Sequence, residues 1–180
     1  MRVAGDGPPL VLVHGLMTSS YSFRYVAEPL AKRFRLYIPD LPGAGESDVP
    51  HAPLGPIALA RALGALIDGL SIRGARVVGN SMGGYVAMQL ALLDPSAMGR
   101  LLTVHAPGVP TPRMRALTFA MSSFPRLVSR VDARIARDPF RWVHRNVHYF
   151  DETLKSREEH REYARPLSTD EGRAAFLSMV

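Results

Sequence analysis

Short, largely apolar runs alternate with longer stretches of helical periodicity over the first hundred residues. These runs cover residues 10–13, 35–38, 75–78 and 101–104, and each is too short for a buried helix. The first run is apolar at every position, which is typical of a parallel strand, because such strands are buried on both faces. The sequence therefore predicts four parallel strands, and residues 2–7 read as the tail of an earlier strand and its turn.

Helical patterns separate these strands. We expect helices over residues 25–34, 57–70 and 82–93, the last of which ends at Asp94-Pro95. The second helix has one apolar face, which comprises Ile57, Ala60, Leu63, Leu66, Ile67 and Leu70. Strands that alternate with helices predict an α/β fold in which a parallel sheet is covered on both sides.

From Pro110 onward the pattern is helical and has no strand-like run, so we divide the chain into an incomplete α/β core (1–110) and a helical region (111–180). Arginines recur there at steps of three and four residues, along one helical stripe that Pro139 divides. They are Arg126, Arg130, Arg134, Arg137, Arg141 and Arg145. Such a stripe is typical of a solvated face. The functional alternatives are contact with a membrane surface, an acidic substrate or an acidic partner.

A G-x-S-x-G motif lies directly between the third predicted strand and the third predicted helix. It consists of Gly79, Asn80, Ser81, Met82 and Gly83. In a strand–turn–helix context this motif holds the serine on a sharp, strained turn, with its hydroxyl lifted above the edge of the sheet. The context therefore favours a nucleophile over a structural turn serine.

Two more motifs follow the first two strands: His14-Gly15-Leu16, and a D-x-P-G-x-G-x-S loop from Asp40 to Ser47. With the elbow at Ser81, in this order and at these separations, they resemble the α/β-hydrolase superfamily over residues 3–105. The resemblance is to its serine-nucleophile branch. It implies a partial α/β-hydrolase fold with a helical cap over the nucleophile.

The resemblance also implies roles for the matching residues. Ser81 is the nucleophile, and the main-chain N–H groups of Leu16 and Met82 form the oxyanion hole. The residues expected to shape the site are His14, Gly15, Gly79, Asn80, Gly83 and His105. Because position 81 is a serine and not a carboxylate, the epoxide-hydrolase and haloalkane-dehalogenase branches are disfavoured.

A serine hydroxyl needs a histidine base and an acid that orients this base. In the α/β-hydrolase fold the acid and the histidine follow the nucleophile in the chain, in that order. Downstream of Ser81 no acid ends a late strand and no histidine lies in a late loop. We therefore expect the chain to be truncated, with the triad acid and base missing.

Three function classes follow from these observations. The first is a serine hydrolase of carboxylic esters that forms an acyl-enzyme on Ser81. The second is a C–C bond hydrolase of the meta-cleavage type, because members of that group carry a similar G-N-S-M-G-G elbow. The third is a non-catalytic fragment, or a protein that a partner completes. The expected substrate is accordingly a small-molecule ester or a diketone-type compound.

Composition narrows the remaining options. The absence of cysteine excludes disulfides, cysteine zinc sites and thiol catalysis, and we expect no metal or other cofactor. There is no stretch of membrane-spanning length and no signal-peptide pattern, which favours a cytoplasmic protein. The net charge of +6 comes without a recognised nucleic-acid-binding motif, so we expect no nucleic-acid partner.

Overall fold

The structure, a computed structural model, describes residues 1–108, 112–149 and 151–179. The predicted boundary between residues 110 and 111 lies outside the described residues. The strands of the described part are β1 (Arg2–Ala4), β2 (Pro9–Val13), β3 (Arg35–Ile38), β4 (Ala75–Asn80) and β5 (Met98–Val104). The helices that alternate with them are α1 (Arg24–Ala31), which follows a short 3-10 turn at Ser20–Phe23, α2 (Pro56–Gly69) and α3 (Met82–Leu93).

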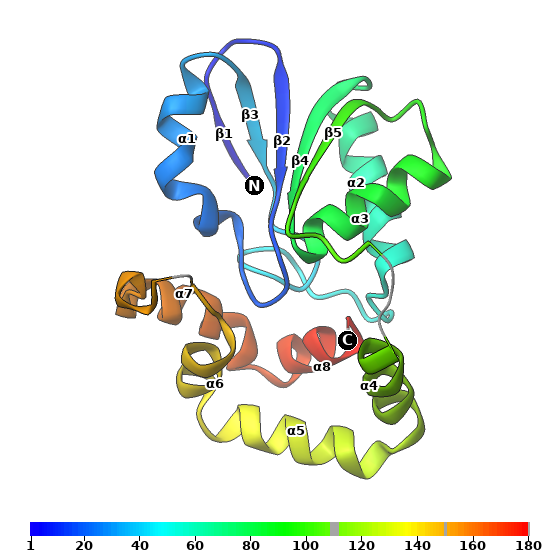
Figure 1. Cartoon of the computed structure of the whole chain (residues 1–180), viewed down its shortest axis with the longest axis vertical. Helices are drawn as coiled ribbons and strands as arrows, with labels where there is room; N and C mark the ends of the chain where they lie inside the picture. The colour runs from blue at the N-terminus through cyan, green and yellow to red at the C-terminus, as the bar shows by residue number, and fades with distance from the viewer. Residues whose placement is uncertain (109–111, 150, 180) are drawn as a thin grey trace.

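These strands form one sheet in the order β1-β3-β2-β4-β5 (Figure 1). The four predicted strands are confirmed, and each is parallel to its neighbour. The sheet is not parallel throughout, however. Residues 2–4 form a strand that runs antiparallel to β3, with Val3 opposite Tyr37.

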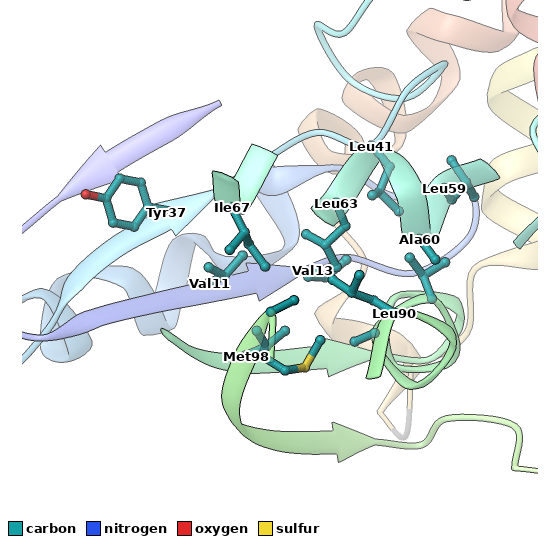
Figure 2. Packing of buried hydrophobic residues seen from close by; sticks show 14 of the residues in the cluster. Val11, Val13, Tyr37, Leu41, Leu59, Ala60, Leu63, Ile67, Leu90 and Met98 are labelled. Carbon is teal, nitrogen blue, oxygen red and sulfur yellow. The ribbon is translucent and has the colours of Figure 1, made fainter. Parts of the chain in front are cut away.

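The central strands are buried on both faces, as their continuous apolar sequence predicts. On one face, Leu10 and Leu12 of β2 pack with β3 residues and with the apolar side of α1. On the other face, Val11 and Val13 belong to the cluster that α2 and α3 cover. Figure 2 shows Ile67 and Leu63 of α2 beside these two valines. The strict alternation of a strand thus assigns neighbouring residues to two separate cores.

The buried face of α2 differs from the predicted one. Ile57 is 52% exposed, and the buried residues are instead Leu59, Ala60, Leu63 and Ile67. At 3.6 residues per turn, Ile57 lies roughly 110° from the centre of this buried arc. The prediction was therefore wrong at the first turn of the helix and right for the turns that cross the middle of the sheet.

The rest of the described chain is helical, as predicted. It contains α4 (Pro112–Ser123), α5 (Pro125–Arg137), α6 (Pro139–Asn146), a 3-10 turn at Glu152–Leu154, α7 (Arg157–Leu167) and α8 (Asp170–Ser178). Pro139 ends the arginine-rich stretch of α5 and begins α6, because proline fits the first turn of a helix but not its interior. No helix in the described ranges is long and apolar enough to cross a bilayer.

The helices α5 to α8 share a small apolar core of their own. Its members include Ile135, Val143, Tyr163 and Phe176, and it packs against Leu16 in the loop after β2. This contact places the helical region at the end of the sheet where the parallel strands finish (Figure 1).

A buried carboxylate also joins the helical region to the α/β core. Glu159 of α7 is fully buried, and its Oε1 lies 3.3 Å from the guanidinium group of Arg24, which begins α1. The hydroxyl groups of Tyr163, at 3.0 Å, and of Tyr149 donate to the same oxygen. Burial and then this hydrogen bond raise the pKa of Tyr149 to about 12. Arg24, Tyr149 and Tyr163 therefore depend on the Glu159 carboxylate as their shared partner.

Glu159→Ala is expected to lower the free energy of unfolding by about 3–5 kcal/mol, because it leaves the Arg24 charge and two hydroxyl groups without their acceptor. Urea denaturation followed by circular dichroism measures this loss. Glu28→Ala is the matched control, since Glu28 is an exposed glutamate on α1 and its removal should change stability by no more than about 0.5 kcal/mol. Equal effects of both substitutions would contradict a structural role for Glu159.

Candidate active site

Three loops meet where adjacent parallel strands end. Val13 of β2 is in register with Gly79 of β4, and Asn80 of β4 is in register with Val104 of β5. The carboxyl ends of β2, β4 and β5 therefore lie at one edge of the sheet. His14, Ser81 and His105 follow these ends directly, and this edge is where open α/β sheets bind their ligands.

Ser81 occupies a strained backbone position between β4 and α3. Its φ is 51° and its ψ is −120°, a region that residues with a side chain seldom adopt. The main-chain N–H of Ser81 donates to the carbonyl oxygen of Val104, 2.8 Å away, which ties the turn to β5. The sharp turn that the motif predicts is therefore present at this serine.

The glycines of the elbow are required by close backbone packing. A Cβ on Gly83 would overlap the carbonyl oxygens of Val13 and His14, so α3 begins directly against the end of β2. A Cβ on Gly79 would lie 2.5 Å from the Cα of Gly84. Strand and helix thus approach each other too closely for any side chain at these two positions.

His14 is buried, and both of its ring nitrogens form hydrogen bonds with main-chain groups. Nε2 accepts a hydrogen bond of 2.9 Å from the N–H of Leu41, so Nδ1 carries the proton and donates to the carbonyl oxygen of Gly15 at 2.8 Å. Burial lowers the pKa of His14, although the bond to Gly15 and the charge of Asp40 act in the opposite direction. This neutral ring joins the loops after β2 and β3.

Two buried histidines make stability depend on pH. Burial and then the nearby His144 lower the pKa of His160, as burial does for His14. Below the ordinary value of 6.5 the unfolded chain therefore binds more protons than the folded chain. We expect the free energy of unfolding to fall as the pH decreases from 6.5, by up to about 1.4 kcal/mol per pH unit for each histidine.

Urea denaturation between about pH 7.5 and pH 5 measures this slope. His160→Gln should reduce the slope, whereas His51→Gln, at an exposed position in the loop before α2, should leave it unchanged. A stability that does not vary over this range would show that neither ring is held neutral by the fold.

Asp40 braces the same edge of the sheet. One carboxylate oxygen accepts from the N–H of Ser20 at 2.7 Å, and the other accepts from the N–H of Glu46 at 3.3 Å. Although burial raises the pKa of Asp40, these hydrogen bonds hold it below its ordinary value. The predicted loop from Asp40 to Ser47 is thus folded around its first residue, whose carbonyl oxygen accepts from the Ser47 hydroxyl at 2.7 Å.

The resemblance assigns the oxyanion hole to the N–H groups of Met82, which follows Ser81 directly in the chain, and of Leu16, in the loop after β2. A Cβ on Gly15 would lie 3.2 Å from the Cβ of Ser81, so the loop after β2 touches the elbow. Within the described residues, the N–H groups of Leu16 and Met82 have no acceptor. The carbonyl oxygen of Gly15 accepts from His14 and from the Thr18 hydroxyl, at 2.9 Å from the latter. Because a trans peptide holds its C=O and N–H in opposite directions, these bonds orient the N–H of Leu16 away from them.

No histidine in the described part of the chain forms a hydrogen bond with the Ser81 hydroxyl. His105 follows β5 with a φ of 52° and an exposed side chain. His144 and His160 stack edge to face in the helical region, with ring centres 4.9 Å apart. His148 lies 3.6 Å from Glu152 on the surface. Among these histidines, only His105 lies at the edge of the sheet that carries Ser81.

A cavity of about 30 Å³ lies between the elbow and the helical region. The loops that the sequence singled out contribute His14, Gly15 and Met82, and the helical region contributes Tyr163 and Phe176. These two aromatic residues were not predicted from the sequence, because they reach the cavity only through the packing of α7 and α8 and have no local sequence signal. A cavity of this volume holds about one water molecule. Among the described residues, no three potential metal ligands cluster together.

Comparisons with known proteins agree with this architecture. A family model described as the alpha/beta hydrolase fold matches residues 8–171. The chain is 36% identical over 114 residues to the 2-hydroxymuconate semialdehyde hydrolase of a Pseudomonas species, a match that covers 61% of this chain and 40% of that protein. It is 37% identical over 103 residues to the pimeloyl-[acyl-carrier protein] methyl ester esterase of Vibrio cholerae, covering 57% of this chain and 38% of that protein.

Among solved structures, the epoxide hydrolase CorEH superimposes with a TM-score of 0.83 and 27% sequence identity, over 97% of this chain and 66% of that one. The matched segment spans well under two thirds of the curated relatives. The family match covers most of the chain, and the sheet order, the elbow and the loops around it have the corresponding arrangement. The chain therefore belongs to the alpha/beta hydrolase fold family.

Proposed function

We propose that this protein is a serine hydrolase of carboxylic esters that forms an acyl-enzyme on Ser81. The observation that carries the proposal is the φ of 51° at Ser81, on a turn between β4 and α3. Backbone strain at a non-glycine residue lowers stability, and it is concentrated at functional sites. In a turn between a strand and a helix, this strained conformation presents a nucleophilic serine.

In the proposed reaction the Ser81 oxygen attacks the acyl carbon, and the carbonyl oxygen acquires negative charge. The N–H groups of Leu16 and Met82 stabilise this charge, since both are without an acceptor and the peptide before Leu16 is oriented by its bonds to His14 and Thr18. The alcohol then leaves, and water releases the acid from Ser81. The similarity to an esterase from Vibrio cholerae supports this choice of substrate class.

The rate depends on a base for the Ser81 proton. A positioned general base contributes about 10²–10⁴-fold to such a step. Because no histidine of the described residues is bonded to Ser81, we expect acylation of this chain to be slow and to accelerate when imidazole is added as an external base.

A second candidate is hydrolysis of a C–C bond in a diketone-type compound of the meta-cleavage class. It is favoured by the 36% identity to a 2-hydroxymuconate semialdehyde hydrolase and by the elbow sequence from Gly79 to Gly84. Epoxide hydrolysis is not proposed despite the likeness to CorEH, because the elbow presents a hydroxyl and not a carboxylate.

We also propose that residues 111–180 act as a cap over an α/β core formed by residues 1–110. The contacts of α5 to α8 with the loop after β2, and the cavity shared by Met82 and Phe176, support this division. Since that cavity holds only about one water molecule, the cap has to move for a longer acyl chain to bind.

The test is covalent labelling of the folded chain with a fluorophosphonate probe, measured by intact mass and peptide mapping. We expect one label, on Ser81, at a rate that imidazole increases. Turnover of p-nitrophenyl acetate supports the esterase, whereas loss of dienoate absorbance without ester turnover supports the C–C hydrolase. Folded protein that remains unlabelled with and without imidazole would overturn both and favour a non-catalytic or partner-completed protein.

A further inference from the structure

The positive charge of the chain is concentrated in one segment. Residues 112–149, which contain α4, α5 and α6, carry eight arginines and two aspartates. The rest of the chain carries fourteen basic and fourteen acidic side chains, so the net charge of +6 belongs entirely to this segment.

Four of these arginines line one groove between α5 and α6, well separated in the sequence from the Ser81 loops. The groove has a volume of about 990 Å³. Its charged lining is formed by Arg134 and Arg137 at the end of α5, by Arg141 and Arg145 of α6, and by one carboxylate, Asp138, between the two helices. We call the groove lined by these four arginines the arginine groove; Figure 1 shows α5 and α6, the two helices that carry them.

Within the described residues, none of the four guanidinium groups forms an ion pair, and all four side chains are exposed. The two nearby aspartates form other hydrogen bonds, although Asp138 also lines the groove. Asp132 accepts from Arg173 at 2.8 Å, and Asp138 caps α6 by accepting from the main-chain N–H of Arg141 at 2.8 Å. Like charges at these spacings repel one another, so the arrangement lowers stability unless an anion is present.

One aromatic residue also belongs to the lining of the groove. Trp142 lines it, and the Nε1–H of this ring is buried with no hydrogen-bond acceptor among the described residues. A buried donor without an acceptor costs about 1–3 kcal/mol. The four guanidinium groups outnumber the one carboxylate of the lining, that of Asp138.

We propose that the arginine groove binds a phosphate-bearing small molecule, with a diphosphate group as the part recognised. Planar guanidinium groups bind phosphate oxygens through paired hydrogen bonds, and four of them balance the charge of two adjacent phosphates. The concave shape favours a compact polyanion over the flat surface of a bilayer. The apolar faces of Trp142 and Val131 bound the same space and give the remainder of the ligand a surface to pack on.

Trp142 is the one tryptophan of the chain, so its fluorescence reports on this groove without background. We expect titration of the full chain with inorganic pyrophosphate at low salt to change this fluorescence saturably, and added salt to weaken binding. The double substitution Arg137→Gln/Arg141→Gln should weaken binding at least about tenfold. The matched control is Arg33→Gln/Arg61→Gln, which removes the same charge from exposed sites on the α/β core and should change affinity less than about twofold.

A fluorescence that does not change up to about 10 mM pyrophosphate would overturn the proposal, as would equal weakening by the two double variants. If pyrophosphate gave no response but the chain sedimented with phosphatidylglycerol vesicles, the proposal would be wrong and the groove would bind a membrane surface. If the chain instead bound polyglutamate, the groove would bind an acidic protein. The readout does not involve Ser81. A failure here therefore leaves the proposed hydrolase untouched, and inactivity at Ser81 leaves the groove untouched.

Discussion

Replacing Ser81 with alanine is expected to remove all labelling by a fluorophosphonate probe while the fold is retained. The substitution removes the attacking oxygen. It removes no structural hydrogen bond, because the Ser81 side chain forms none with any described residue. Alanine tolerates the left-handed backbone at this position about as well as serine does, so the strain is unchanged. Intact mass after probe treatment should therefore show a stoichiometric adduct on the wild type and none on the variant.

The matched control is Ser71→Ala. Ser71 is also a serine in the left-handed region, with a φ of 55°, but it precedes β4 and so lies at the opposite end of that strand from Ser81. This variant should be labelled at the wild-type rate. Labelling that persists in Ser81→Ala would mean that another residue reacts with the probe, and the assignment of the nucleophile would be wrong.

Gly83→Ala is expected to destabilise the protein by about 3 kcal/mol and to abolish labelling at Ser81. The new methyl group would overlap the carbonyl oxygens of Val13 and His14, which are backbone atoms and cannot rotate aside. Relief requires the start of α3 to move away from β2, and this movement displaces Ser81 and the N–H of Met82 together. Thermal and urea denaturation measure the first effect, and probe labelling measures the second.

Gly69→Ala is the control for this substitution. Gly69 ends α2, and a Cβ there would meet no atom within 4 Å. Replacing it should leave stability unchanged or raise it by up to about 1 kcal/mol, because alanine reduces the entropy of the unfolded chain. If both variants were equally stable, the elbow would be looser than the close approach of β4, α3 and β2 indicates.

Several features of the fold could be predicted because they depend on neighbouring residues only. The runs at 10–13 and 35–38, apolar except for Arg35, indicated buried strands, and both lie inside the sheet. The elbow at Ser81 could be predicted because a glycine pattern between a strand and a helix limits the backbone to one kind of turn. Pro139 separated two helices for the equally local reason that its ring cannot continue α5.

Other features were not accessible in this way. The exposure of Ile57 depends on where α2 crosses the sheet, and the antiparallel pairing of β1 with β3 depends on which strand edge is open. The roles of Arg24 and Glu159 were missed entirely. These residues are far apart in the chain. The charged residues around Glu159 are typical of an exposed helix face, so the sequence did not indicate that α7 buries Glu159 against Arg24 of α1.

The amino-acid order alone therefore decided the α/β architecture, the candidate nucleophile and the division of the arginine-rich stretch into two helices, since each follows from periodicity or from a backbone restriction within a few residues. Tertiary packing decided which groups bond to the ring nitrogens of His14, which helices meet the loop after β2, and that four arginines line one groove. Those outcomes arise from contacts between segments that are far apart in the sequence. A local pattern of residues does not determine how close two such segments lie in space.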